Sequence, residues 1–266
     1  MKFTIITVSY NSEKTIERTI RSIISQSYND YEYIIVDGKS TDSTVDIIKS
    51  YESQFDGRLK WQSEPDKGIY NAMNKGIARA KGEIIGIVNS DDWLEHDTLK
   101  CIYELSRIVE DVQNTLFCGS VFFHYNNGGK QLFKSDKKRF YEGIPHHSYN
   151  FGAYHPAIFV GRMVYHVVGL FDENFKIEAD TDFIYRCYQH RMNFVFIDNV
   201  LSNMADGGAS NVIDIKKYYN EKKYYLRKND IHGIAAVVLM SKFLVRITFK
   251  KFMPDSMSRL VRTLRK

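Results

Sequence analysis

The sequence predicts an α/β fold built on an open, mostly parallel sheet with helices on both faces. Three observations predict it. Within the first 90 residues, four short apolar segments with strand character alternate with three segments that carry apolar residues at helical spacing. The last strand segment is apolar almost throughout, as expected for a strand buried on both faces. Apolar residues make up 44% and charged residues 26% of the chain, the composition of a globular domain.

The strand segments have the length and the β-branched composition of strands, and they cover 3–9, 31–36, 59–62 and 83–88. The intervening segments predict helices over 16–24, 45–55 and 68–80. A cluster of polar residues follows each strand, at 9–11, 37–38, 64–67 and 89–92. Because ligands bind at the carboxyl ends of parallel strands, we expect these clusters to converge on one ligand site.

The chain beyond residue 92 is less regular. Two segments, 117–125 and 130–134, flank Asn126-Asn127-Gly128-Gly129 and predict a hairpin. A helix is expected from near Asp180 and a strand over 194–200. Helices are expected again in the tail, 211–266.

The tail carries 14 Lys and Arg against 4 Asp and Glu, a local charge of +10 in a chain of net charge +5. The first 210 residues therefore carry about −5. Apolar and basic residues alternate at helical spacing over 241–252, which predicts a basic amphipathic helix on an anionic membrane surface. A solvated helix packed on the body of the chain or on a partner is the alternative. We expect no nucleic-acid binding, because no motif accompanies the charge.

Compartment signals are consistent with one another. The three cysteines, Cys101, Cys118 and Cys187, are odd in number and form no CxxC pair, which disfavours a disulfide framework or a zinc site. The N-terminus has the pattern of a strand, not of a signal peptide, and no apolar run approaches the ~18 residues that span a bilayer. We therefore expect a cytoplasmic protein, peripheral on the inner face of the cell membrane.

Adjacent carboxylates follow the fourth strand segment, at Asp91 and Asp92. Their mutual repulsion would be relieved by Mn²⁺ or Mg²⁺, which take oxygen ligands. Such an ion would bridge the phosphates of a nucleoside diphosphate. The pair equally suits the start of a helix. Asp37 ends the second strand segment, where it would accept from a base or ribose, or cap the next helix. No GxGxxG follows the first strand and no P-loop motif occurs, which disfavours those nucleotide sites.

Four motifs in this order resemble glycosyltransferase family 2: VSYN at 8–11, DGKSTDST at 37–44, EPDKGIYNAMNKG at 64–76 and NSDD at 89–92. The resemblance covers about residues 1–210 and is greatest to members that act in bacterial O-antigen, capsule and colanic acid assembly. It implies a GT-A fold, a Rossmann-like mixed and mostly parallel sheet flanked by helices. It divides the chain into a catalytic domain, 1–210, with a nucleotide-binding half, 1–92, and an acceptor half, 93–210, followed by the basic helical tail, 211–266.

The same resemblance implies roles for the polar residues at the strand ends. Thr7, Ser9 and Asp37 would contact the base or ribose of the donor. Three more residues would line the nucleotide pocket, namely Asn11, Asp66 and Lys75. Asp91 would lie near the ribose and Asp92 would be the principal ligand of Mn²⁺ or Mg²⁺, although which of the two holds the metal stays open.

Inverting transfer, which the family implies, needs one general base. The family places it at a helix start after a G-x-F-D-E segment, and here GLFDE at 169–173 precedes EADTD at 178–182. Asp180 matches the base and Asp182 is the second candidate, while both also suit a helix start. His155 matches a position near the acceptor or the diphosphate, although a lone histidine is more often structural. The run at 207–210 resembles a mobile loop that closes over the donor.

Some residues depart from the family's pattern. Asn71 and Asn89 stand where Asp is frequent, and Ala179 stands where Glu is usual. No QxxRW motif occurs, which favours transfer of a single sugar. We expect a metal-dependent, inverting, hexosyltransferase-type enzyme that moves one sugar from a nucleotide sugar, UDP-sugar favoured, to a polyprenyl-diphosphate-linked glycan in bacterial surface polysaccharide synthesis.

Two other classes are less well supported. A nucleotidyltransferase would show a glycine-rich basic loop after the first strand, and residues 9–14 do not form one. A catalytically inactive sugar- or nucleotide-binding protein would be expected to lack the acidic pair or Asp180, and both are present.

Overall fold

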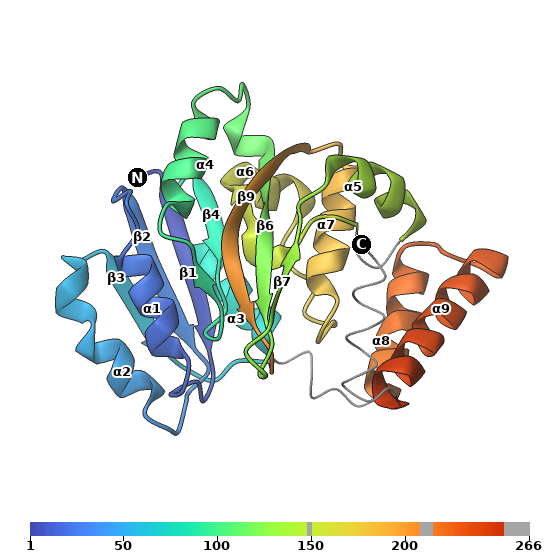
Figure 1. Ribbon diagram of the computed structural model, residues 1–266, viewed down its shortest axis with the longest axis horizontal. Coiled ribbons are helices and arrows are strands. Elements are labelled where there is room, and N and C mark those ends of the chain that lie inside the picture. The colour runs from blue at the N-terminus through green and yellow to red at the C-terminus, as the bar shows by residue number, and fades with distance from the viewer. Residues whose placement is uncertain (148–150, 208–214, 253–266) are drawn as a thin grey trace. The chain divides into compact units, whose positions relative to one another are not determined.

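The computed structural model describes residues 1–147, 151–207 and 215–252, with side chains in the last helix described to residue 245. The chain divides into two compact units, Met1–Asn211 and Val212–Lys266. The first unit is a three-layer α/β structure around one sheet (Figure 1). The sequence-based expectation of a mixed, mostly parallel sheet flanked by helices is confirmed.

Four parallel strands form the N-terminal half of the sheet in the order β3-β2-β1-β4. They are β1 Phe3–Ser9, β2 Tyr31–Asp37, β3 Leu59–Ser63 and β4 Ile84–Ile87. Strands β1, β2 and β4 are buried along their whole length. Because they run parallel, their polar carboxyl-terminal residues lie along one edge of the sheet.

The remaining strands extend this sheet in the order β4-β8-β6-β9-β5, with β7 paired to β6. They are β5 Trp93–Leu94, β6 Thr115–His124, β7 Lys130–Phe133, β8 Ile158–Gly161 and β9 Asn193–Ala205. The expected hairpin is present as the antiparallel pair β6 and β7. Strand β9 runs further than expected, to Ala205, because it follows β6 in parallel through a register shift beside Cys118 and Ser120. That extension brings its end back to the polar edge.

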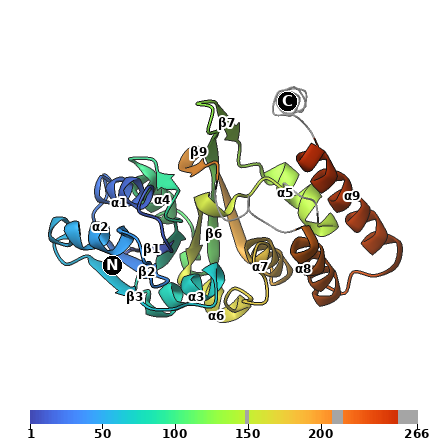
Figure 2. The ribbon, with the colours of Figure 1, turned by 90° about the horizontal axis from the view of Figure 1, so that it is seen from below.

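The described residues of this unit form the α-helices α1 Ile16–Ile24, α2 Thr44–Ser50, α3 Ile69–Arg79, α4 Thr98–Ser106, α5 Lys137–Gly143, α6 Arg162–Val168 and α7 Ala179–Gln189. Short 3₁₀ turns are η1 Glu52–Phe55, η2 Val112–Asn114, η3 Ile144–His146 and η4 His155–Ala157. Figure 2 shows α1 and α4 on one face of the sheet and α3 and α6 on the other. The expected face of α1 is fully buried at Ile16, Ile20 and Ile23.

Helix α3 lies unusually close to β1. A Cβ atom at Gly76 would stand 2.5 Å from Cγ2 of Ile6, so only glycine allows this approach. The contact fixes α3 against the strand that carries Ser9 at its end. Residues of α3 therefore keep a constant position relative to the polar edge.

The second unit contains α8 Ile215–Lys228 and α9 Gly233–Phe252. The rings of Tyr218 and Phe243 meet edge to face, with centroids 4.7 Å apart. Within the described residues, no helix is long and apolar enough to cross a membrane. In the expected amphipathic helix, 241–252, the basic side chains of Arg246, Lys250 and Lys251 lie outside the described residues. Residues 208–210 of the expected mobile loop also lie outside them.

Candidate functional site

Asp37 joins the ends of three strands. Its side chain is fully buried. Oδ1 accepts from the hydroxyls of Ser9 at 3.0 Å and Ser40 at 2.5 Å, and Oδ2 accepts from the hydroxyl of Ser63 at 2.6 Å and from the Ser40 amide at 2.9 Å. A carboxylate offers about four acceptor positions. A donor base or ribose would therefore have to replace one of these serine partners to reach Asp37.

Two other residues expected at the donor, Thr7 and Asn11, accept hydrogen bonds from other residues of the chain. Thr7 is fully buried, and its hydroxyl accepts from the Tyr33 hydroxyl at 2.9 Å. Its side chain thus lies inside the unit instead of at the edge, because Thr7 stands two residues before the end of β1 and is covered there. Asn11 is exposed, but its Oδ1 accepts from the Thr41 amide at 2.9 Å and so supports the 40–41 loop.

An exposed aromatic ring, which sequence reasoning left without a role, stands at the same edge. Tyr10 is 63% exposed. A Cβ atom at Gly38 would lie 3.4 Å from the Tyr10 ring and 2.5 Å from Oδ2 of Asp66, so glycine lets these two groups close over the strand ends. An exposed tyrosine beside a carboxylate offers a stacking face and an acceptor to a nucleoside. The sequence placed Tyr10 in the VSYN motif but carried no sign of its exposure.

Asp66 and Lys75 hold the loop between β3 and α3. Oδ1 of Asp66 accepts from the Gly68 amide at 2.8 Å. Nζ of Lys75 lies 2.8 Å from Oε1 of Glu64 and donates to the Pro65 carbonyl at 3.0 Å. The charge of Lys75 is therefore balanced by that of Glu64. Oδ2 of Asp66 remains at the polar edge of the sheet.

Asp91 and Asp92 follow β4 at this edge, as the sequence predicts. Asp92 is almost fully buried, and it accepts from the Ala205 amide and from Nδ2 of Asn89, each at 3.3 Å. Burial, with a smaller contribution from the Asp91 charge, raises the pKa of Asp92 to about 8. Burial also raises the pKa of Asp91. Oδ1 of Asn89 is buried and has no hydrogen-bond partner within the part of the chain that the structure describes.

These oxygens fit a divalent cation. Two partly desolvated carboxylates and an unpartnered amide oxygen are hard donors whose electrostatic cost a cation would remove. Among the described residues, no group of three or more His, Cys, Asp and Glu forms a complete metal cage. Mg²⁺-type sites commonly take one or two carboxylates and complete their shell with substrate phosphates and water. Asp91, Asp92 and Asn89 would hold the ion in that manner.

Helix α1 fixes the backbone of the acidic pair. Nη2 of Arg18 donates to the Asp91 carbonyl at 2.8 Å, and its guanidinium lies 3.7 Å from the ring centre of Trp93. The Thr19 hydroxyl donates to the Asp92 carbonyl at 2.6 Å. The carboxylates are thereby presented on a supported turn.

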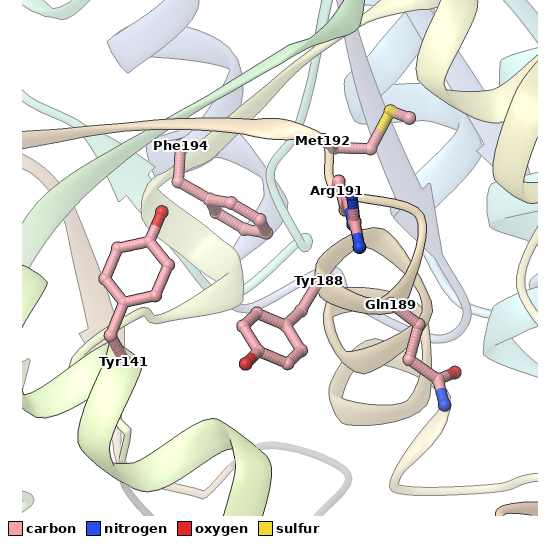
Figure 3. Close-up of a pocket in the computed structure, with 6 residues that line it drawn as sticks. All are labelled: Tyr141, Tyr188, Gln189, Arg191, Met192 and Phe194. Atoms are coloured by element: carbon pink, nitrogen blue, oxygen red, sulfur yellow. The ribbon is translucent and has the colours of Figure 1, made fainter.

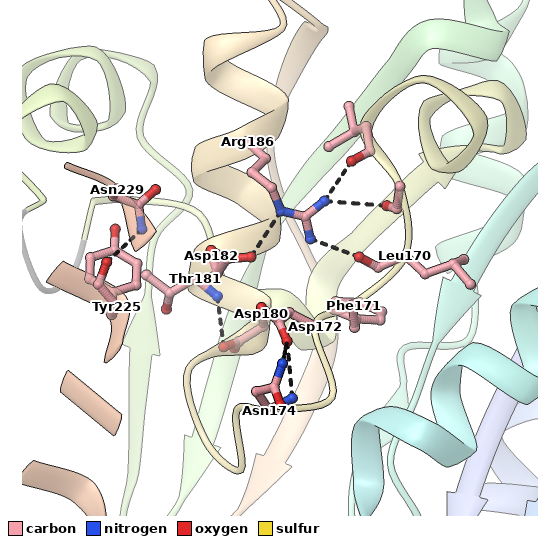
Figure 4. Close-up of polar contacts among 12 residues, drawn as sticks. Leu170, Phe171, Asp172, Asn174, Asp180, Thr181, Asp182, Arg186, Tyr225 and Asn229 are labelled. Carbon is pink, nitrogen blue, oxygen red and sulfur yellow. Dashed lines mark hydrogen bonds and ion pairs between the residues drawn. The ribbon is translucent and has the colours of Figure 1, made fainter. Parts of the chain in front are cut away.

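The two candidate bases occupy different environments at the start of α7 (Figure 4). Asp182 is fully buried and points to Arg186, with Oδ2 and Nε 2.9 Å apart. Arg186 also donates to the carbonyls of Val168 at 2.6 Å and Leu170 at 2.8 Å. Asp180 is partly exposed, and its Oδ1 accepts from the Thr181 amide at 2.8 Å. Burial in this ion pair disfavours Asp182 as the base and favours Asp180.

His155 lies in η4, and its ring meets that of Phe171 edge to face, with centroids 5.7 Å apart. Burial lowers the pKa of His155 to about 4. The imidazole is therefore neutral at physiological pH, and it can exchange hydrogen bonds with an acceptor but carries no charge for a diphosphate.

A cavity of about 370 Å³ lies away from these residues (Figure 3). It is lined by Tyr141, Tyr188, Gln189, Arg191, Met192 and Phe194. Gln189 ends the helix near whose start Asp180 lies, about 14 Å along the axis at 1.5 Å per residue. None of the sequence-predicted site residues lines this cavity.

Comparison with known proteins agrees with the fold. The family model described as glycosyl transferase family 2 matches residues 4–166. A PGL/p-HBAD biosynthesis glycosyltransferase of Mycobacterium tuberculosis is 30% identical over 222 residues, which cover 81% of this chain and 82% of that protein.

Two solved structures share the fold. TarS 1-349 of S. aureus in complex with UDP-GlcNAc has a TM-score of 0.61 and 20% identity, over 84% of this chain and 65% of that one. GalNAc-T7 with UDP, GalNAc and Mn²⁺ has a TM-score of 0.59 and 14% identity, over 77% of this chain and 44% of that one. The chain thus spans less than two thirds of either solved chain.

Proposed function

This chain belongs to glycosyltransferase family 2, and we propose that it moves one sugar from a UDP-sugar to a hydroxyl of a lipid-linked glycan, with inversion, in bacterial surface polysaccharide assembly of the O-antigen, capsule or lipopolysaccharide type. The observation that carries the proposal is the acidic pair Asp91–Asp92 at the carboxyl ends of the parallel strands, beside a buried oxygen of Asn89 that has no hydrogen-bond partner among the described residues. Mn²⁺ or Mg²⁺ held by these residues would stabilise negative charge on the leaving nucleoside diphosphate.

Donor binding is assigned to the residues that converge at this edge. Tyr10 offers its exposed ring to the uracil, and Asp66 offers Oδ2 beside it. The serine hydroxyls now on Asp37 can turn from that carboxylate to the ribose, which frees acceptor positions for the base. The choice of UDP draws on the two structural neighbours, of which one is solved with UDP-GlcNAc and the other with UDP.

Asp180 is the proposed general base. It takes the proton of the acceptor hydroxyl while that oxygen bonds to the anomeric carbon and the bond from that carbon to UDP breaks, with its electron pair leaving on UDP. A single displacement of this kind inverts the anomeric centre. The first turn of α7 favours a charged carboxylate at Asp180, so the base is ready to accept. Neutral His155 is assigned a hydrogen bond to the acceptor.

The acceptor is proposed to lie at a membrane surface, which the second unit would contact. Five large apolar residues in the described part of α9 are solvent-exposed, namely Ile234, Val237, Val238, Leu244 and Val245. At 100° per residue they fall within about a third of the circumference of the helix. Ile234 is 84% exposed, and exposed Lys242 borders the face. An apolar face with basic neighbours is typical of helices that lie in the interface of an anionic membrane. We therefore propose a peripheral position on the inner face of the cell membrane, where a polyprenyl-diphosphate-linked acceptor is reached.

A thermal-shift panel of nucleotide sugars, each with Mn²⁺ and with EDTA, tests the proposed donor and metal. A ligand at 100 times its Kd adds about 2.7 kcal/mol to the free energy of unfolding. We expect one UDP-sugar to stabilise the protein only with the metal, and Asp92→Asn to remove that response. Stabilisation without metal would contradict the role of the acidic pair. Donor binding without turnover on any acceptor or water would support an inactive binding protein.

A further inference from the structure

The segment that leads to Asp180 is fastened to α3 by three polar side chains. Glu173 lies across two asparagines one helical turn apart. Nδ2 of Asn71 is 3.0 Å from its Oε2, and Nδ2 of Asn74 is 3.0 Å from its Oε1. We call Asn71, Asn74 and Glu173 the α3 clamp. Each carboxylate oxygen thus has its own donor from the helix.

Asn74 also holds the backbone of the same segment. Its Nδ2 donates to the Phe171 carbonyl at 2.9 Å, and its Oδ1 accepts from the Phe171 amide at 3.1 Å. Asn74 is buried, so these bonds are shielded from water. Both ends of one side-chain amide are therefore used to fix a segment about 100 residues away in sequence.

Further contacts extend the attachment toward α7. The Tyr70 hydroxyl donates to the Ile177 carbonyl at 2.5 Å. Nζ of Lys176 donates to the Lys67 carbonyl at 3.0 Å. The attachment thus spans 171–177, and α7 with Asp180 begins two residues later. The direction in which the chain enters α7 is set from α3.

At its other end, this attachment reaches the polar edge of the sheet, where the donor is proposed to bind. Helix α3 starts directly after Gly68, whose amide donates to Asp66, and close packing of Gly76 on Ile6 fixes the helix to β1. The bonds from Asn74 and Asn71 lower the pKa of Glu173, with help from the charges of Lys67 and Lys176. Glu173 is therefore ionised, and its bonds are charge-assisted and directional.

We propose that the α3 clamp positions Asp180 against the donor sugar, so that Asn71, Asn74 and Glu173 are positioning residues for transfer. This inference rests on the proposed function of Asp180. Neither Asn71 nor Glu173 is needed to close the core, since both are only partly buried, while Phe171 and Phe175 of the segment are buried. The hydrogen bonds fix the position of this segment along α3, which apolar packing alone does not do.

A charge exchange within the clamp tests the proposal. Asn71→Asp places a second carboxylate opposite Glu173 and breaks that bond by repulsion. In Asn71→Asp with Glu173→Gln, Nε2 of the glutamine donates to the new carboxylate while its Oε1 keeps the bond from Asn74. The paired variant has the net charge of the wild type, and the new carboxylate can still accept from the Lys67 amide as Asn71 does at 3.2 Å. Asn199→Asp, at an exposed position of β9, adds the same charge elsewhere.

Three quantities are measured on the full chain. They are amide hydrogen exchange of 171–177 without substrate, the Kd of UDP with Mn²⁺ by calorimetry, and the turnover of UDP-sugar at saturation. For Asn71→Asp we expect faster exchange, a Kd within about threefold of the wild type, and a kcat lower by about a hundredfold, as misplacement of a reacting group by about 1 Å produces. The paired variant should recover protection and most of kcat, and Asn199→Asp should change neither.

Other outcomes identify which claim is wrong. Faster exchange with unchanged kcat, or a paired variant that stays as slow as Asn71→Asp, would overturn the positioning role. An equal loss in Kd and kcat would make the clamp part of donor binding. If the wild type neither binds nor turns over any UDP-sugar, the proposed function itself fails, and the clamp role fails with it.

Discussion

Asp180 and Asp182 are two residues apart, and the structure assigns them opposite properties, which a pair of substitutions can separate. Asp182→Ala removes the partner of Arg186 from a fully buried position. Loss of one member of a buried ion pair costs roughly 3–5 kcal/mol. Arg186 keeps its bonds to the Val168 and Leu170 carbonyls and is slightly exposed, which places the cost near about 3 kcal/mol, the lower end of that range. At about 2–4 °C per kcal/mol for a unit of this size, the Tm should fall by about 6–12 °C.

Asp180→Asn should do the reverse. The amide oxygen of the asparagine can still accept from the Thr181 amide, and loss of the favourable charge at the helix start costs about 0.5 kcal/mol. Turnover of UDP-sugar should be lost, while the Kd of UDP with Mn²⁺ stays unchanged. Thermal unfolding, calorimetry and a coupled assay for released UDP give the three readings on each variant. A stable Asp182→Asn protein without turnover, beside an active Asp180→Asn protein, would show that Asp182 is the base.

Three further predictions concern His155, Gly38 and α9. Because burial lowers the pKa of His155 to about 4, the unfolded chain binds a proton below about pH 6.5 that the folded chain does not bind. The free energy of unfolding should therefore fall as the pH drops from about 6.5 to 4. Urea unfolding across this window should show a shallower decline for His155→Gln. Gly38→Ala places a methyl group 2.5 Å from Oδ2 of Asp66. The steric cost of about 1–3 kcal/mol should lower the affinity for UDP by about tenfold, as measured by calorimetry. Unchanged affinity would remove Asp66 from the donor site. Ile234→Glu with Val238→Glu should abolish sedimentation with vesicles that contain anionic lipid, whereas Ile108→Glu, at an exposed apolar residue of the first unit, should not. Equal binding of both variants would remove the membrane claim.

The parallel half of the fold follows from local pattern. Strands β1 to β4 and helices α1 and α3 have continuous apolar runs or a clear helical period, and these signals lie within single segments of the chain. Strands β5 and β8 were not predicted, because two and four residues carry little pattern and both are formed by pairing with distant strands. The length of β9 depends likewise on its parallel partner β6.

Motif resemblance indicates where the candidate site lies but does not resolve the roles of its individual residues. Thr7 and Ser9 share one face of β1, and only the position of Tyr33 shows that Thr7 is covered. Asp180 and Asp182 both suit a helix start, yet residues two apart on a helix point about 200° apart, and only packing shows which one meets Arg186.

Asn71 shows how a departure from a family pattern acquires meaning from structure. By sequence it stands where aspartate is frequent, which gives no indication of a role. In the structure its amide donates to Glu173, a bond that an aspartate could not make while Glu173 is ionised. Glu173 therefore determines which residue fits at position 71, although it lies 102 residues further along the chain.

The stereochemistry of sugar release tests the central claim most directly. The full chain is incubated with Mn²⁺ and a UDP-α-sugar labelled at the anomeric carbon, and the first product of transfer to water is observed by NMR before it mutarotates. A single displacement with Asp180 as base predicts the β anomer first, and no product from Asp180→Asn. An α anomer as the first product would contradict the inverting mechanism and the assigned role of Asp180.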